Sequence, residues 1–222
     1  MKARCSQLYR LMTDARSGNG LSETAKEYVR ELWIAEKLGR TVPELTNKYV
    51  QKGIENEQDS LELYQKYLNS KGTNVFVSKN KKHFENDYLT GTPDTLGADV
   101  KSCWSIHTFM EADIKKEYYW QLLGYSILTE VPEWNLVYTL TNCSEMLISD
   151  ELKKIAYWLG DHDCITEKYK EMEKQTYKNM TFDDIPELSR VKVFPIAFKF
   201  GDKEKVRERV KEAKKYYDTL SL

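Results

Sequence analysis

The sequence is poor in the residues that build metal clusters and disulfides. It has 4 cysteines, at positions 5, 103, 143 and 164, and 3 histidines among 222 residues. No two cysteines form a C-x-x-C pair, so the spacing indicates neither a zinc ribbon nor an iron–sulfur ligand set. The stretch Asp161-His162-Asp163-Cys164 looks like a metal site, but after Gly160 its polar composition is more typical of a loop. We therefore expect free thiols in a reducing cytoplasm.

Long apolar runs are also absent. The longest uncharged stretch with apolar character runs from Tyr118 to Thr129, and a membrane-spanning helix needs roughly 18 residues or more. Arg10 interrupts any apolar segment near the start of the chain, and no signal peptide is readable there. Internal repeats and low-complexity segments are missing as well. We expect a cytoplasmic protein without a membrane partner.

Neither sign of charge is in excess. The chain has 34 Lys and Arg against 35 Asp and Glu, which gives a formal net charge of −1. Taken as an average, that balance argues against a protein that binds polyanions. The mean hydropathy is low, at −0.66, yet 12% of the residues are aromatic. Disordered chains are poor in aromatic residues, so we expect a folded protein with one large domain or at most two small ones.

Apolar periodicity and turn residues predict a mixed α/β (α+β) fold, in which helices flank a sheet. Thr24-Ala25-Lys26-Glu27 has the form of a capping box, and Pro195 places the last strand at an edge or a bulge. Helices are expected over Thr24–Gly39, Thr46–Leu68, Ile114–Glu130, Ser149–Leu159, Ile165–Lys178 and in a last helix capped by Asp202. Strands are expected over Thr73–Ser78, Tyr88–Thr92, Ala98–Ser105, Asn135–Thr141 and Arg190–Phe200.

Two polar residues fall on predicted apolar helix faces. A carboxylate at such a position, here Glu57, is costly unless it is paired, binds a metal or reaches water at the edge of the stripe. A buried amide, here Gln121, either satisfies backbone groups or hydrogen-bonds a ligand. The apolar residues that share these faces are Val50, Ile54, Leu61 and Tyr64 for Glu57, and Ile114, Tyr118, Tyr125 and Leu128 for Gln121.

Two acids and a lysine gather around one predicted strand. Asp99 and Lys101 point to one side of it, because side chains alternate along a strand, while Val100 points into the core. Asp94 precedes them in a Pro-Asp turn. Paired carboxylates suit a divalent cation such as Mg²⁺, and the lysine suits an activated water. The acid-x-Lys triplet alone is weak, since it occurs three other times in helical surroundings, but here it has a strand context and the Pro-Asp turn.

Four motifs in this order resemble the PD-(D/E)xK nuclease superfamily, and within it the YqaJ-type viral recombinases that include the exonuclease of phage lambda. The first is Gly-x-x-x-Glu-x-x-small-x-x-x-Tyr over Gly53–Tyr64. The Pro93-Asp94 turn, the strand triplet Asp99-Val100-Lys101 and the helical run Gln121-Leu122-Leu123-Gly124-Tyr125-Ser126 follow. The match is strong over about residues 45–130. The resemblance implies one nuclease domain over 1–222, with N-terminal helices (1–45), a catalytic core (46–142) and C-terminal helices and strand (143–222).

The resemblance also implies roles for individual residues. Asp94, Asp99 and the backbone carbonyl of Val100 would hold Mg²⁺, or Mn²⁺ in its place, and Glu57 would be a further ligand. Lys101 would position the attacking water. Gln121 and Tyr125 would support the site or contact DNA, and Thr92 and Ser6 match positions with hydroxyls near the 5′-phosphate of the substrate. The chain begins shortly before Ser6, so Arg4 or Lys2 would replace an upstream phosphate-binding arginine.

The activity implied is hydrolysis of linear double-stranded DNA in the 5′ to 3′ direction, which leaves a 3′ single strand for recombination. Relatives form ring-shaped trimers and pass that strand to an annealing protein, so the same partners are expected here, in the cytoplasm of a bacterial host if a phage encodes the protein. Two alternatives stay open: another nuclease of the superfamily, such as an endonuclease or a RecB-like module, and a catalytically silent nucleic-acid-binding scaffold. The cysteine spacing argues against a cluster-bearing Cas4-like nuclease.

The charge average hides a polarised chain, which makes a DNA partner compatible with a net charge of −1. The balance is +3 over residues 1–50, −1 over 51–110, −8 over 111–189 and +5 over 190–222. The last helix is expected to bury Val206, Val210, Ala213 and Tyr217, and its other faces carry lysine and arginine. Those faces are either simply solvated or contact the phosphate backbone.

Overall fold

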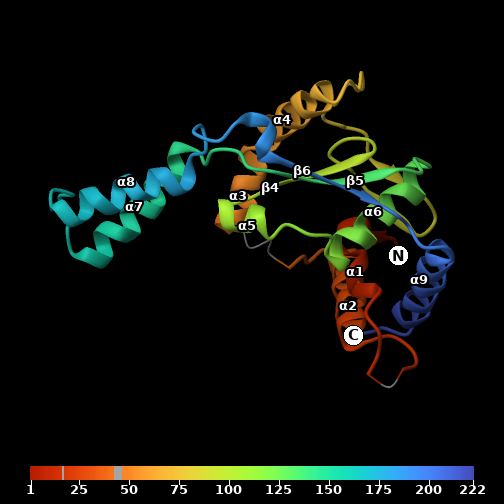
Figure 1. The fold of residues 1–222 in the computed structure, drawn as a ribbon. Coiled ribbons are helices and arrows are strands. Elements are labelled where there is room, and N and C mark those ends of the chain that lie inside the picture. The colour runs from red at the N-terminus through yellow and green to blue at the C-terminus, as the bar shows by residue number, and fades with distance from the viewer. Residues whose placement is uncertain (17, 43–46) are drawn as a thin grey trace.

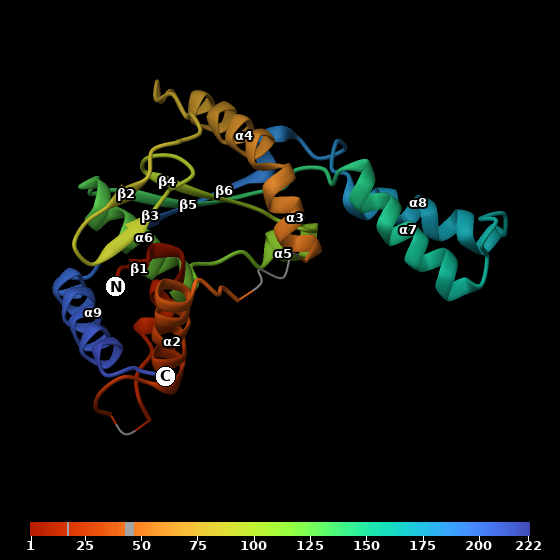
Figure 2. The ribbon, with the colours of Figure 1, turned by 180° about the vertical axis from the view of Figure 1, so that it is seen from behind.

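The computed structural model describes residues 1–16, 18–42 and 47–222. Its larger sheet has the order β4-β5-β6 (Figure 1). Strand β4 (Ala98–Ser102) runs parallel to β5 (Trp134–Thr139), and β6 (Val191–Ile196) pairs antiparallel with β5. A smaller sheet has the order β1-β3-β2, with β3 (Leu89–Gly91) between β1 (Ala3–Arg4) and β2 (Phe84–Glu85) (Figure 2). The mixed α/β fold predicted from the sequence is confirmed.

Helices cover both faces of the larger sheet. Helix α4 (Glu57–Ser70) packs Leu63 and Tyr64 against an apolar cluster that includes Ala98 and Val137. Helix α6 (Lys116–Thr129) covers the opposite face. The central strand β5 is therefore apolar on both sides, and Leu136 and Val137 are completely buried. Alternation along β4 directs Asp99 and Lys101 toward the α6 side, because Ala98 and Val100 belong to the α4 side.

The N-terminal segment and the last helix form a further layer below the sheets (Figure 2). It contains the 3-10 turn Cys5–Gln7, α1 (Leu8–Leu11), α2 (Glu23–Leu38) and α9 (Asp202–Asp218). Helix α9 buries Val206, Val210, Ala213 and Tyr217, as predicted. Packing is closest around Cys5, because a Cβ added at Gly124 would lie 2.8 Å from its sulfur.

Two helices form an arm that extends away from the sheets (Figures 1 and 2). They are α7 (Glu145–Leu159) and α8 (Glu167–Met180). The backbone N–H of Cys143 donates to the carbonyl of Met180 at 2.8 Å, which closes the base of the arm. Helix α3 (Lys48–Glu55) holds this base, since the Ser144 hydroxyl donates to Glu55 at 2.6 Å. The remaining short elements are α5 (Ile106–Met110) and the 3-10 turn Glu187–Arg190.

Most predicted elements are confirmed within a few residues, but the long helix Thr46–Leu68 is wrong. Thr46 lies outside the described residues, and the rest forms two helices, α3 and α4, that meet at Asn56. The Asn56 side chain hydrogen-bonds the carbonyl of Asn142, so it serves the tertiary structure instead of one continuous helix. The apolar stripe fails in α3 for the same reason, and Val50 and Ile54 are exposed.

Three smaller predictions are corrected. Residues Thr73–Ser78 form no strand, because Gln65 takes their backbone groups: it donates to the carbonyl of Val75 and accepts from the N–H of Val77. The N-cap of α2 is Ser22, whose hydroxyl accepts from Ala25, and not Thr24. Asp202 is the first residue of α9, and it accepts a hydrogen bond from the Tyr119 hydroxyl instead of capping the helix.

Pro195 lies in β6, which is an edge strand, as expected for a residue without an N–H. None of the described helices has the length and apolar character that a membrane span requires. The boundary expected at residues 45 and 46 falls among the residues that are not described. Cys143 lies at the base of the arm, and the division at residues 142 and 143 stays a prediction.

Candidate active site

The Pro-Asp turn is held from a neighbouring loop. The backbone N–H of Asn80 donates to the carbonyl of Asp94 at 2.6 Å, and its side-chain amide donates to the carbonyl of Pro93 at 2.9 Å. A single β-bridge between Thr95 and Ala98 then turns the chain directly into β4. The short link to Asp99 is therefore a tight hairpin, as its length predicts, and Gly97 provides the positive φ of 81° that the turn needs.

Asp99 and Lys101 form an ion pair on the α6 side of β4. The ammonium lies 2.7 Å from Asp99 Oδ2, and the aspartate side chain is only 1% exposed while that of the lysine is 27% exposed. Among the described residues, Oδ2 has no hydrogen-bond partner besides this ammonium contact. Asp99 thus presents a buried carboxylate oxygen whose capacity to accept is largely unused, which is an unusual and costly state.

The charges of the site act strongly on one another. Burial and the nearby carboxylate of Asp99 raise the pKa of Asp94 to about 6. Burial tends to lower the pKa of Lys101, but the Asp99 carboxylate outweighs it, so the pKa of Lys101 is raised and the ammonium form is favoured. The ammonium also lies 5.1 Å from the ring centroid of Tyr118. Two carboxylates that repel each other beside a single cation form a site with room for more positive charge.

Helix α6 contributes Gln121 and Tyr125. The Gln121 amide donates to Asp99 Oδ1 at 3.3 Å and to the Tyr125 hydroxyl at 3.2 Å. The Tyr125 hydroxyl donates to the carbonyl of Thr92 at 3.5 Å, and burial raises its pKa. Both readings of the buried amide were open in the sequence, and the structure places Gln121 against the carboxylate and not against the backbone. A chain of polar contacts therefore links α6, Asp99 and the Pro-Asp turn.

Glu57 lies near the site but engages a different partner. It is the first residue of α4 and forms an ion pair with Lys79 at 2.5 Å. Its charge contributes to the raised pKa of Asp94. Nowhere in residues 1–16, 18–42 and 47–222 do three or more His, Cys, Asp or Glu side chains form a group that could hold a metal ion. The oxygen atoms near one another that could bind a cation are thus the carboxylates of Asp94 and Asp99 and the backbone carbonyl between Asp99 and Lys101.

The residues predicted to contact DNA lie along the smaller sheet. Strand β1 pairs with β3 so that Arg4 is opposite Thr90, and both Arg4 and Ser6 are exposed. Thr92 is exposed just beyond the end of β3. The chain start is therefore next to the strand that leads to Asp94, although the sequence between them is long.

Sequence reasoning missed two residues here. Asn80, which holds the Pro-Asp turn, gave no signal because its role depends on backbone carbonyls. His83 belongs to no motif in the sequence, but its ring lies between two threonines: Nδ1 is 2.9 Å from the Thr92 hydroxyl and Nε2 is 2.8 Å from the Thr90 hydroxyl. The i, i+2 spacing of the threonines on a predicted strand was the available signal.

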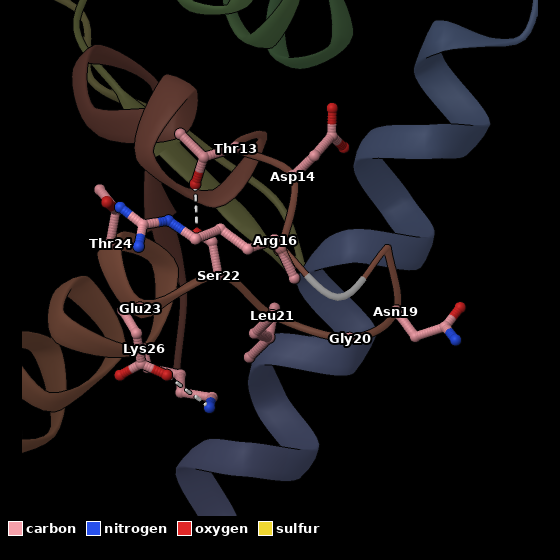
Figure 3. Close-up of a pocket in the computed structure, with 11 residues that line it drawn as sticks. Thr13, Asp14, Arg16, Asn19, Gly20, Leu21, Ser22, Glu23, Thr24 and Lys26 are labelled. Carbon is pink, nitrogen blue, oxygen red and sulfur yellow. Dashed lines mark hydrogen bonds and ion pairs between the residues drawn. The ribbon is translucent and has the colours of Figure 1, made fainter.

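A cavity of about 690 Å³ lies elsewhere, between the loop after α1 and the start of α2 (Figure 3). Its walls include Arg16, Glu23 and Lys26, and the last two are paired with each other at 2.8 Å. None of the residues predicted to be functional lines this cavity. The acidic site is therefore set apart from it, on the sheet.

Comparisons with known proteins show which solved structures share this fold. No family model matches the chain, and no curated protein sequence matches it. A solved phage-related exonuclease from Haemophilus somnus 129PT is similar over 98% of this chain and 94% of its own, with a TM-score of 0.75 and 25% identity. The chain has a phage-exonuclease fold.

A second solved structure has the same fold. An alkaline exonuclease from Laribacter hongkongensis, LHK-Exo, is similar over 98% of this chain and 88% of its own, with a TM-score of 0.62 and 15% identity. The same enzyme in complex with dAMP has a TM-score of 0.56 and 16% identity. These likenesses confirm the resemblance inferred from the four motifs and the PD-(D/E)xK type of fold, and they support the prediction of a nuclease.

Proposed function

We propose that this protein is a metal-dependent deoxyribonuclease that degrades linear double-stranded DNA from its ends. The observation that supports it best is the group formed by Asp94, Asp99, Lys101 and Gln121 on a phage-exonuclease fold. A protein that only binds nucleic acid has no physical need for two repelling carboxylates beside a lysine. The active site of a phosphodiester hydrolase, in contrast, needs oxygen ligands for a cation and a group that orients water.

The residues present fit a divalent cation. Asp99 Oδ2 is a buried carboxylate oxygen with unused capacity to accept, and the pKa of Asp94 is raised partly because Asp99 is close. Both conditions are relieved by a hard cation with oxygen ligands. We assign its ligands to Asp94, Asp99 and the carbonyl of Val100, with Mg²⁺ as the ion and Mn²⁺ as a substitute. Bound there, the ion would neutralise charge on the scissile phosphate and lower the pKa of the attacking water.

The side chains of the chain itself would do the remaining work. Lys101, held as an ammonium by Asp99, donates hydrogen bonds and so orients the water instead of taking its proton. Gln121 fixes the rotamer of Asp99 through Oδ1, which leaves Oδ2 directed into the site. Glu57 is held by Lys79 in this structure, and it would act through an intervening water if it contributes to the metal site.

Contacts with DNA are proposed for two surfaces. The first is on the smaller sheet, with Arg4, Ser6 and Thr92. Tyr125 is buried, so it would support this surface from behind and not contact DNA. The second is the exposed side of α9, which carries Lys203, Lys205, Arg207, Lys211, Lys214 and Lys215. Arg209, on the same helix, is instead bound to Glu212 at 3.3 Å and to the carbonyl of Gly20 at 2.9 Å.

We further propose the context that the resemblance implies. The enzyme would work in the 5′ to 3′ direction as a homotrimer and supply 3′ single strands to an annealing protein during recombination. Its place would be the cytoplasm of a bacterial host. Sedimentation of the purified protein with and without duplex DNA measures the oligomeric state, and a monomer under both conditions contradicts the trimer without affecting the proposed chemistry.

The decisive experiment uses end-labelled linear duplex DNA. Purified protein with Mg²⁺ is expected to shorten it from the ends, and Lys101→Ala and a sample with EDTA serve as matched controls. Duplexes labelled on either strand report the direction, and 5′-phosphate and 5′-hydroxyl ends are compared. Loss of linear DNA with closed circular DNA left intact supports the exonuclease.

Other outcomes identify the alternatives. Cleavage of closed circular DNA would indicate an endonuclease of the same fold. Binding of DNA without cleavage, with Mg²⁺ or Mn²⁺ supplied, would indicate a silent scaffold and reject the proposal. Equal cleavage by wild-type and Lys101→Ala protein would show that the assigned site is not the one responsible.

A further inference from the structure

The outer face of the smaller sheet carries an arrangement of hydroxyls and one imidazole that the catalytic roles above do not use. His83 precedes β2, and its ring bridges the hydroxyls of Thr90 and Thr92 at 2.8 and 2.9 Å. His83 and Thr92 are exposed and Thr90 is partly exposed, so a ligand from solvent reaches all three. Thr92 is two residues before Asp94, and its carbonyl contacts the Tyr125 hydroxyl, so the group lies next to the acidic site.

The number of N–H groups on the His83 ring determines which atoms of this bridge donate and which accept. A neutral imidazole has one N–H and one bare nitrogen. One threonine must then donate its only hydroxyl hydrogen to the bare nitrogen, and that hydrogen is lost to any ligand. An imidazolium donates from both nitrogens, so both threonine oxygens accept and both hydroxyl hydrogens point away from the ring. The charged form therefore turns Thr90 and Thr92 into two donors beside a positive charge.

The charges around the bridge favour an anion. Arg4 lies opposite Thr90 on β1, and cross-strand partners share a face of a sheet. The one acid on the same row is Glu85, opposite Thr90 on β2, and Lys2 is paired with it at 3.0 Å. Two hydroxyls, an imidazole and a guanidinium on the exposed face of the smaller sheet match the oxygens of a phosphate group.

We propose that His83 is a positioning residue that orients the hydroxyls of Thr90 and Thr92 toward a phosphate of the DNA strand being degraded. The inference rests on the proposed function and deepens it. The phosphate is either the one at the 5′ end or one in the backbone next to it, and the chemistry of recognition is the same for both. His83 does not touch the reacting atoms, so its effect belongs to substrate binding and not to the chemical step.

The test compares His83→Ala with wild-type protein on linear duplexes that carry either 5′-phosphate or 5′-hydroxyl ends. We expect KM to rise about tenfold, as when charge-assisted hydrogen bonds worth about 1.4 kcal/mol are lost, while kcat at saturating DNA stays nearly unchanged. A rise only for 5′-phosphate ends identifies the end phosphate, and an equal rise for both identifies a backbone phosphate. His162→Ala, at an exposed histidine in the loop between α7 and α8, is the matched control.

Conservative variants separate orientation from a structural effect. Asn at position 83 places an amide nitrogen where Nδ1 was, so His83→Asn should restore part of the contact with Thr92 and part of the affinity. Thr90→Val should weaken binding in the wild-type background and have little further effect when combined with His83→Ala, because the two residues act as a unit. Additive losses would contradict the proposal.

Binding without cleavage gives an independent readout. Fluorescence anisotropy of a short 5′-phosphorylated duplex in EDTA reports affinity, and its salt dependence reports phosphate contacts. If wild-type protein neither binds nor degrades DNA, the proposed function fails. If it does both and His83→Ala has the same KM and affinity, the proposed function stands and the role of His83 is rejected. The same is true if His83→Ala lowers kcat and leaves KM unchanged.

Discussion

Two lysines, one half-buried and one buried, lie near the carboxyl end of the same strand, and they differ in what surrounds them. Lys101, within β4, is ion-paired with Asp99 at 2.7 Å. Lys52 is completely buried and donates to the carbonyls of Cys103 at 2.7 Å and Trp104 at 3.4 Å, directly after β4. Burial lowers the pKa of Lys52, whereas Asp99 raises that of Lys101.

The difference shows how a fold assigns one residue type to two tasks. In the described part of the chain, Lys52 forms no ion pair, and its ammonium lies 5.2 Å from the ring centroid of Phe182 at the base of the arm. Two of its three N–H groups are directed to fixed carbonyls, so it fastens α3 to the end of β4. Lys101 faces carboxylates and a partly open site, so its donors are available for a water. We expect substitutions of the two lysines to separate activity from stability.

The largest effect is expected for Lys101→Ala. Loss of the ammonium that orients the water should lower the cleavage rate about a thousandfold, within the range for removal of a group that acts on the reacting water, while the protein still folds. The measurement is the initial rate on linear duplex DNA, with circular dichroism to check the fold. A variant that retains much of the wild-type rate would remove the distinction between the two lysines.

The opposite result is expected for Lys52→Ala. It leaves a cavity and two carbonyls without their donor, so the free energy of unfolding should fall by about 2–4 kcal/mol. The folded fraction should keep a rate close to that of the wild type. Urea denaturation measures the first quantity. Lys48→Ala is the matched control, because its partly exposed pair with Glu151 at 3.3 Å should contribute less than about 1 kcal/mol.

The position of α6, which holds Gln121 against Asp99, depends on how closely this helix approaches the N-terminal turn. Gly124→Ala would place a Cβ 2.8 Å from the sulfur of Cys5, and the overpacking should cost about 1–3 kcal/mol. Gly53→Ala in α3 meets no atom within 4 Å and should be neutral or stabilising by about 0.5–1 kcal/mol. Thermal or urea denaturation of the two variants measures the difference. Equal effects on stability would show that the close contact at Gly124 does not limit side-chain size there.

The smallest effect concerns the repulsion between the carboxylates of Asp94 and Asp99, which has no counterpart around Lys52. Because the pKa of Asp94 is raised from 3.8 to about 6 in the folded protein, the folded state holds this proton more tightly than the unfolded state. The stability from this group is fully present below about pH 4 and is lost as the pH rises through about 6. In EDTA, Asp94→Asn should remove this decline, worth about 1–2 kcal/mol after screening.

Mg²⁺ provides the complementary measurement. It should raise the melting temperature of wild-type protein more at pH 8 than at pH 5, since it relieves a repulsion that exists only when both carboxylates are ionised. The increase should be absent in Asp94→Asn. An equal increase in both proteins would place the bound ion elsewhere.

The arrangement around Lys101 was predictable from the sequence, because it follows from local patterns within one strand and one helix. Alternation along a strand puts Asp99 and Lys101 on one side, and helical spacing puts Gln121 on a buried face. These patterns hold in the structure, where Gln121 donates to Asp99. The assignment of metal ligands stays a prediction.

The burial of Lys52 could not be predicted from the sequence, because its partners are distant in sequence and are brought together only by the fold. Lys52 is buried while Val50 and Ile54 in the same helix are exposed, which is the reverse of the pattern that periodicity assumes. The reason is that carbonyls after β4 and the ring of Phe182 are brought to Lys52 by the fold. The same limit applies to His83 and Asn80, whose partners are fixed only once the loops are in place.

The position of the arm has a consequence for how this chain tolerates change in length. Strands β5 and β6 are adjacent and antiparallel, in register from Trp134 opposite Ile196 to Thr139 opposite Val191, so a short turn would suffice to join them. The arm is thus an insertion in a hairpin connection, and it enters and leaves through the contact between Cys143 and Met180. Its helices can lengthen, shorten or be exchanged as a module while the sheet that holds Asp99 and Lys101 keeps its register.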